Sequence, residues 1–477
     1  MNEEQASRPV NPRRRKRTRA EIIKENYLPT IIIGVTVILC FIFIITAITR
    51  ADAARKAHEE EVAASIAAQE ELKRQNDALA ASLLNQAEAY ASNYDYDNAI
   101  EAIDSFTGDI TQYPNLLDKR AEYESLKSKL VLWNDPGQVV NLSFQVLIAD
   151  SNRAYKDRTY SGAYNRNFVT ITEFPKILEE LYNNNYILVS LDDVYNISTD
   201  ASGIATYTAK ELYLPAGKKP LMITQTQINY YYYMTDSNGD KLPDAKGAGF
   251  ASKLIVDQNG NFANTYIDAS GNELVGDYDM VPLLESFIAS HPDFSYRGAK
   301  AVLAVTGFDG IFGYRTHAGA ESTFGQEAFN TEVADAKNLV AALKNAGYEI
   351  ACYTYSNIAY GSSSLTQIKD DLKKWKNEVA PIVGDIRTFV FAQNSDIGTK
   401  ENPYSGQVYN ELRANGFGIF LGFANTDGST WAYEGQQYVR MGRIMVSGSN
   451  MAYNSSWFDG IFDPAKVLDS NRGNIPK

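Results

Sequence analysis

The sequence predicts an α/β fold, a distorted (β/α) barrel preceded by a transmembrane helix and an α-helical stalk. An uncharged, mostly apolar stretch of roughly 24 residues near the N-terminus is long enough to cross a bilayer as a helix. A segment rich in Ala, Glu, Leu and Lys follows it, with almost no Gly or Pro. From about Gly137 onward, short apolar runs alternate with amphipathic segments, which is the pattern of repeated βα units.

Composition limits the classes of function. Of the 477 residues, 44% are hydrophobic, enough for a large core, and the formal net charge is −13. A protein of this charge is not expected to bind nucleic acid. The two cysteines, Cys40 and Cys352, lie far apart and Cys40 falls in the apolar stretch, so a disulfide framework is excluded.

The N-terminal segment predicts a membrane anchor. Residues 1–25 form a basic tail with a cluster from Arg13 to Arg19, and residues 26–49 carry no charge. This run is longer than the apolar core of a signal peptide, and a buried core helix is the less favoured alternative. Because basic residues are denser before the span than after it, the positive-inside rule places the tail in the cytoplasm. We therefore expect a single-pass protein of the cell membrane with an extracellular C-terminal domain.

Residues 50–136 predict a helical stalk. The segment Asn93–Ile100 (NYDYDNAI) contains an aspartate-rich turn, with small residues at Ala87 and Ala99 on its two sides. This arrangement resembles one helical pair of a tetratricopeptide-type repeat, but no second copy follows at a fixed period. A coiled coil and an intramolecular hairpin both stay open for the stalk, as do the roles of a plain spacer and of a surface for a protein partner.

In residues 137–477, hydrophobic periodicity predicts the order of strands and helices. The predicted strands are 142–149, 187–191, 220–224, 253–256, 262–267, 301–305, 349–354, 388–392 and 418–422. The predicted helices begin near Thr172 and Met280 and cover 333–345, 365–375 and 408–414. Asn259-Gly260 predicts a hairpin between two of the strands. So many βα units favour a barrel, closed or incomplete.

The order of these segments resembles the polysaccharide deacetylase family, whose members contain a NodB-like domain. The resemblance covers most of Leu142 to Arg472, roughly two thirds of the chain. It is carried by Thr170–Phe174 (TITEF), Tyr186–Asp193 (YILVSLDD), Leu214–Pro220 (LPAGKKP), Ala346–Ala351 (AGYEIA) and Ala414–Phe417 (ANGF). The resemblance implies a distorted (β/α) barrel with a divalent metal, usually zinc, at the C-terminal ends of its strands. It also implies the removal of N- or O-acetyl groups from polymeric sugars.

Where the resemblance implies catalytic and metal-binding groups, this chain has other residues. Thr226 and Gln227 stand where the family has two aspartates, a general base and a metal ligand. Tyr353 and Asn357 stand where it has two histidine ligands, and Gln145 stands where related sequences often carry another histidine. Neutral amide and hydroxyl oxygens bind zinc poorly and cannot act as bases near neutral pH. We therefore predict a catalytically inactive member without a metal or other cofactor; zinc or another divalent metal is expected only if the chain is active with atypical ligands.

Aromatic and amide side chains near the predicted strand ends are candidates for glycan binding. Aromatic rings stack on sugar rings, and amides form hydrogen bonds with hydroxyl and acetamido groups. The candidates are Gln225, Tyr230, Tyr231, Tyr355, Gln393, Asn394 and Trp431. The alternative, that the aromatic residues simply fill the core and its rim, stays open because aromatic residues make up 12% of the chain.

Three functions are compatible with these patterns. The first is an inactive, membrane-anchored module of the cell envelope that binds a protein or a glycan, such as peptidoglycan or another acetylated polysaccharide. The second is an active, metal-dependent polysaccharide deacetylase with atypical ligands. The third is a structural scaffold of the envelope that acts through its helical stalk.

Overall fold

The computed structural model describes residues 19–133, 135–201, 205–399, 403–435 and 437–477. Its internal contacts divide the chain into two units, Met1–Ser82 and Leu83–Lys477, and each unit is described by itself. The predicted basic cluster falls mainly on residues 13–17, which lie outside the described residues.

The described part of the first unit is helical. Helix α1 (Arg19–Asn26) precedes α2 (Leu28–Ser92), which contains the whole predicted transmembrane stretch. Within that stretch, the hydroxyl groups of Thr36 and Thr46 donate hydrogen bonds to the carbonyl groups of Ile32 and Ile42, so the helix itself satisfies them. Among the described residues, α2 is the one helix that is long and apolar enough to cross a membrane, which is compatible with a single-pass anchor.

The second unit begins at Leu83, within the last part of α2. A turn connects the end of α2 to α3 (Tyr96–Asp104) in a helical hairpin, and α4 (Pro114–Lys127) follows. The carboxylate of Asp95 caps α3 by accepting a hydrogen bond from the backbone of Asn98. Arg297 ties this turn to the rest of the unit, because its side chain forms an ion pair with Asp95 at 3.0 Å. The predicted turn therefore lies against the segment that leads into one of the barrel strands.

A closed barrel of seven parallel strands forms the centre of the second unit in its described part. Strand β7 closes it, because β7 pairs with β2 along one edge and with β11 along the other. In spatial order the strands are β11 (Val302–Val305), β12 (Glu349–Cys352), β13 (Thr388–Val390), β14 (Ile419–Phe423), β16 (Val439–Met445), β2 (Val140–Phe144) and β7 (Lys219–Thr226). The predicted distorted (β/α) barrel is thus confirmed.

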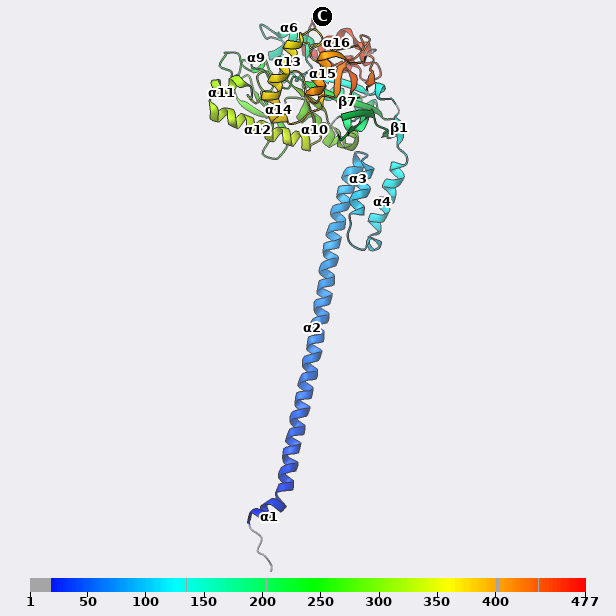
Figure 1. The fold of residues 1–477 in the computed structure, drawn as a ribbon, viewed down its shortest axis with the longest axis vertical. Coiled ribbons are helices and arrows are strands. Elements are labelled where there is room, and N and C mark those ends of the chain that lie inside the picture. The colour runs from blue at the N-terminus through cyan, green and yellow to red at the C-terminus, as the bar shows by residue number, and fades with distance from the viewer. Residues whose placement is uncertain (1–18, 134, 202–204, 400–402, 436) are drawn as a thin grey trace, which may run out of the picture. The chain divides into compact units, whose positions relative to one another are not determined.

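Helices surround the strands of this unit (Figure 1). They bury the outward-facing side chains of the barrel. The longer ones are α7 (Phe174–Asn183), α10 (Met280–Ser290), α12 (Gln326–Asn345), α13 (Leu365–Lys374) and α15 (Gly406–Ala414). The shorter ones are α5 (Ser151–Ala154), α6 (Ser161–Asn167), α8 (Leu191–Val194), α9 (Tyr232–Thr235), α11 (Ala318–Phe324), α14 (Ala380–Val383), α16 (Gly448–Tyr453) and α17 (Pro464–Val467). Ser364 and Gln367 form a capping box that fixes the start of α13.

Smaller strands pair outside the closed ring. Strand β3 (Tyr186–Leu188) adds in parallel to the start of β7, and β15 (Ala432–Glu434) adds in antiparallel orientation to β16. Two antiparallel pairs are β1 (Val131–Trp133) with β6 (Leu212–Leu214), and β4 (Tyr195–Thr199) with β5 (Ala205–Ala209). An insertion forms a separate sheet of β8 (Lys253–Val256), β9 (Phe262–Ile267) and β10 (Glu273–Gly276).

The barrel interior combines an apolar layer with polar side chains near the C-terminal ends of the strands. Ala304 lies in register with Thr226 on one side and with Ala351 on the other, so all three face inward. The apolar interior residues are Met222, Val302, Ala304, Ala351, Val390, Ile419, Leu421, Val439 and Met441. The buried polar residues of the inward-facing set are Asn141, Ser143, Thr224, Thr226 and Arg443. The chemistry of the barrel mouth therefore depends on this second group.

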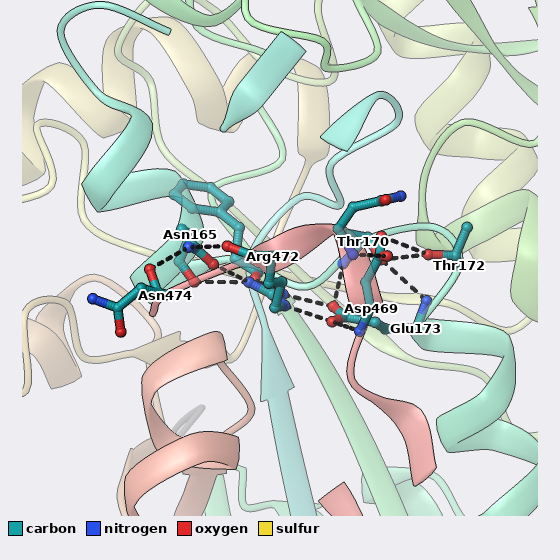
Figure 2. A network of polar contacts seen from close by, with 9 residues as sticks. Asn165, Thr170, Thr172, Glu173, Asp469, Arg472 and Asn474 are labelled. Carbon is teal, nitrogen blue, oxygen red and sulfur yellow. Dashed lines mark hydrogen bonds and ion pairs between the residues drawn. The ribbon is translucent and has the colours of Figure 1, made fainter. Parts of the chain in front are cut away.

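A buried ion pair fastens the C-terminal segment to the loop before α7. Arg472 Nε lies 2.5 Å from Glu173 Oε1, and both side chains are almost wholly buried. The Arg472 guanidinium also donates to the carbonyl groups of Asn165 and Phe168, while Glu173 accepts from the backbone of Asp469 (Figure 2). Because each charge has a full set of partners, the pair is stable as a unit, and removal of one partner leaves the other charge buried alone.

We predict that Arg472→Met lowers the free energy of unfolding of the full-length chain by about 3–5 kcal/mol, because Glu173 then loses its counter-charge. Urea unfolding in detergent, followed by tryptophan fluorescence, measures the change. The control is Lys466→Met, which removes a more exposed ion pair with Glu180 and should change stability by less than about 1 kcal/mol. Equal losses in the two variants would contradict the special role of the buried pair.

Candidate functional site

A cleft of ≈ 590 Å³ opens at the C-terminal mouth of the barrel. Its walls come from the ends of β2, β7, β12, β13, β14 and β16 and from the loops that follow them. The lining residues are Gln145, Asn167, Gln227, Tyr353, Asn357, Gln393, Asn394, Phe423, Ala424, Asn425, Thr426, Arg443, Met445, Asn450 and Trp457. This is the position at which barrels of this type place their functional groups.

Carboxamides dominate the lining of the cleft. Eight of the described lining residues are Asn or Gln: Gln145, Asn167, Gln227, Asn357, Gln393, Asn394, Asn425 and Asn450. No Asp, Glu, His or Cys occurs among the lining residues that the structure describes, and Arg443 is the one charged residue of that set. The cleft can therefore donate and accept many hydrogen bonds but offers no carboxylate or imidazole base.

Several cleft residues have a left-handed backbone conformation. Gln227, Asn357, Gln393 and Asn394 have φ values between 54° and 59°. Residues other than Gly adopt this region rarely, and such residues concentrate at functional sites where the surroundings hold them. At Gln227 the consequence is direct: the strand ends at Thr226, and the turn in the backbone brings the Gln227 side chain into the cleft.

The four positions predicted to replace the family's catalytic and metal-binding residues are only partly assembled. Gln227, Tyr353 and Asn357 line the cleft together, and Asn357 Nδ2 lies 3.4 Å from Gln227 Oε1. Thr226 is fully buried instead, and its hydroxyl group donates to the Phe144 carbonyl at 3.2 Å. Three of the four residues thus meet at the mouth, and the fourth lies within the barrel wall.

The residues at the mouth do not fit a zinc ion. Zinc in proteins is bound by thiolate, imidazole or carboxylate ligands, and no cluster of three or more such groups occurs among the described residues. The nearby amide oxygens are neutral, and the Arg443 guanidinium places a positive charge in the lining. No hydrolytic step through a metal is therefore assigned to this cleft.

The candidate glycan-binding residues separate into two groups. Gln393 and Asn394 line the cleft, and both are exposed. Gln225, Tyr230, Tyr231, Tyr355 and Trp431 do not line it. The internal partners of this second group are Asp279 for Gln225 and Tyr230, Thr306 for Tyr231, Glu378 for Tyr355 and the Phe423 carbonyl for Trp431.

Asp279 explains why two of these candidates face away from the cleft. Its carboxylate is fully buried and accepts hydrogen bonds from Gln225 Nε2 at 2.8 Å, from the Tyr230 hydroxyl at 2.6 Å and from the Leu147 backbone at 2.8 Å. Burial raises the pKa of Asp279 to about 6, although these hydrogen bonds act in the opposite direction. Gln225 and Tyr230 therefore belong to a structural network outside the barrel.

The sequence did not point to several lining residues. Asn167, Phe423, Asn425, Arg443, Asn450 and Trp457 were not among the candidates. Arg443 lies on β16, a strand that the hydrophobic pattern does not predict, because Arg440 and Arg443 interrupt its apolar run. Both arginines are buried, so the signal that would have found them is the set of apolar residues on the two faces of the strand, Val439 and Met441 on one face and Ile444 on the other.

We predict that Asp279→Asn changes the pH dependence of stability. The folded protein holds the Asp279 proton more tightly than the unfolded chain does, so Asp279 makes the unfolding free energy fall as the pH rises from about 4 to about 6. An asparagine removes this contribution, of the order of 3 kcal/mol, and keeps an acceptor for Leu147. Urea unfolding of both proteins between pH 4 and 7 gives the difference; parallel curves would contradict the assignment.

Comparison with known proteins gives structural matches alone. No known family profile and no curated protein matches this chain in sequence. In structure, the chain is similar to the Streptococcus pyogenes deacetylase PplD in complex with acetate. The sequence identity is 12%, the match covers 70% of this chain and 99% of that chain, and the TM-score is 0.34. A polysaccharide deacetylase from Bacillus cereus matches with 9% identity, 68% of each chain and a TM-score of 0.33. Both of these proteins are named as deacetylases.

Proposed function

We propose that this protein is a membrane-anchored, extracytoplasmic member of the polysaccharide deacetylase family that binds a cell-envelope glycan without hydrolysing it. The observation that carries the proposal is the lining of the cleft, with eight carboxamides and no described carboxylate or imidazole. Such a surface matches sugar hydroxyl and acetamido groups, which both donate and accept hydrogen bonds. Peptidoglycan and other acetylated polysaccharides carry these groups in every repeat.

Two aromatic residues give the cleft apolar faces for sugar rings. Trp457 and Phe423 both line the cleft and are partly exposed. Trp457 packs against the backbone of Gly428 so closely that a Cβ atom there would lie 2.4 Å from Trp457 Cγ. A ring held in this way loses little freedom when it stacks on a sugar.

The unpaired polar atoms of the cleft also support binding. Asn357 Oδ1 is buried and has no hydrogen-bond partner in the structure. A buried acceptor without a partner is destabilising, by about 1–3 kcal/mol. A sugar hydroxyl or an acetamido N–H in the cleft can supply the missing donor, so binding relieves this penalty.

The apolar stretch of α2 supports the location at the membrane. It is followed by a helical stalk that separates the barrel from the span in sequence, and basic residues are concentrated before the span. In this orientation the cleft lies on the extracytoplasmic side, where envelope glycans are found. The stalk is also the segment that a protein partner would contact if the chain acted as a scaffold.

We predict that Asn394→Gly weakens the binding of a chitin tetrasaccharide to the full-length chain by roughly three- to tenfold, the value of one lost hydrogen bond. Glycine tolerates the left-handed backbone of this position, so the fold is kept. Isothermal titration calorimetry in detergent measures the affinity. The matched control is Asn185→Gly, another exposed left-handed asparagine that does not line the cleft, which should bind as the wild type does.

We also predict that the purified full-length chain, incubated with excess zinc and then dialysed, retains well under one zinc ion per chain and releases no acetate from acetylated chitin oligomers. The reason is that the mouth offers neutral amides and a cation in place of anionic ligands. Elemental analysis and an acetate assay provide the two measurements. Stoichiometric zinc together with acetate release would instead establish the alternative, an active deacetylase with atypical ligands.

A further inference from the structure

Arg443 is a buried cation in the wall of the cleft. It lies on the inward-facing side of β16, in register with Phe423 of β14, and its side chain is 1% exposed. The guanidinium carbon lies 4.2 Å from the centre of the Phe423 ring and 5.9 Å from that of Tyr353. All three residues line the cleft, so the charge is held between two aromatic rings at the barrel mouth.

The hydrogen bonds of Arg443 go to neutral groups. Nη1 donates to the Ser143 hydroxyl at 2.9 Å and Nη2 donates to the carbonyl of Phe391, while the buried Nε–H has no partner. No carboxylate of the described residues forms an ion pair with it. Arg472 is also buried, but it differs from Arg443 because it forms an ion pair with Glu173 at 2.5 Å.

A buried cation without a counter-charge is unfavourable, and proteins normally pair such groups. Burial lowers the pKa of Arg443, although the guanidinium stays charged because its ordinary pKa is so high. The Asp396 carboxylate acts on the pKa of Arg443 in the opposite direction to burial, but it forms no ion pair with the guanidinium. The free Nε–H and a charge without an ion-pair partner together form a site for an anion. Arginine binds carboxylate and phosphate oxygens through charge-assisted hydrogen bonds, about twice as strong as neutral ones.

We propose that the glycan bound in this cleft carries an anionic oxygen group, a carboxylate or a phosphate, and that Arg443 binds this group. The proposal rests on the proposed glycan-binding function and names the class of sugar that the cleft selects. The amides bind the acetamido and hydroxyl groups, and Arg443 distinguishes an acidic amino sugar from a neutral one. The same fixed cation repels a divalent metal from the mouth of the barrel.

The test uses disaccharides that differ in one group. The first is chitobiose, which is neutral. The second is the disaccharide of N-acetylglucosamine and N-acetylmuramic acid, which adds a lactyl carboxylate. The third is the methyl ester of the second, which keeps its shape without the charge, and the fourth is a phosphorylated chitobiose. Calorimetric titration of the full-length chain in detergent gives an affinity for each.

We expect the wild type to bind an anionic disaccharide about tenfold or more tightly than chitobiose and than the ester. Preference for the lactyl sugar identifies a carboxylate ligand, and preference for the phosphorylated sugar identifies a phosphate ligand. If the charged and neutral disaccharides bind equally well, this inference is wrong while the proposed glycan binding stands. If none of the disaccharides binds, the proposed function fails, and the inference fails with it.

Variants assign the preference to Arg443. Arg443→Met should abolish the difference between charged and neutral disaccharides, and Arg443→Lys should keep part of it because the charge is retained. The matched control is Arg120→Met in α4, which lies outside the cleft and should keep the full difference. An unchanged preference in folded Arg443→Met would overturn the assignment. If that variant does not fold, two other affinities decide whether Arg443 binds the anionic group. They are the affinity of Arg443→Lys for the charged disaccharides and the wild-type preference for the lactyl disaccharide over its methyl ester.

Discussion

The closure of the barrel across β7 is the constraint on which the rest of the structure depends. Along one edge β7 pairs with β2, and along the other its last three residues pair with β11. This pairing brings strand ends from residues 144 to 445 around one opening. Without it, Gln227 would follow a strand at one end of an open sheet and Asn357 a strand near the other end, so no common cleft would form.

The charges buried in this fold have two different roles. The pair of Arg472 and Glu173 joins the C-terminal segment to the loop before α7 and satisfies both charges internally. Arg443 has only neutral partners and contributes its charge to the cleft. A fold keeps an unpaired buried charge more readily where a ligand can complete it, and this is why we connect Arg443 with ligand selection.

An element could be predicted from the sequence where the residues that determine it are close to one another in the chain. The hairpin of β8 and β9 was predicted with its observed bounds, because Asn259-Gly260 sets the turn and register locally. Strand β16 was missed, because arginines at 440 and 443 make its sequence resemble an exposed segment. Burial of these arginines depends on residues distant in sequence, because Arg440 packs against Tyr404 in the loop before α15 and Arg443 packs against Phe423 of β14.

The sequence by itself determined the apolar helix and the alternating βα units, because each depends on composition or short-range spacing. The tertiary structure decided which side chains share the cleft. Gln225 and Gln227 are two residues apart on one strand end, yet Gln225 turns outward to Asp279 and Gln227 lines the cleft. The left-handed backbone at Gln227, held by pairing with a distant strand, makes this difference, and no local pattern encodes it.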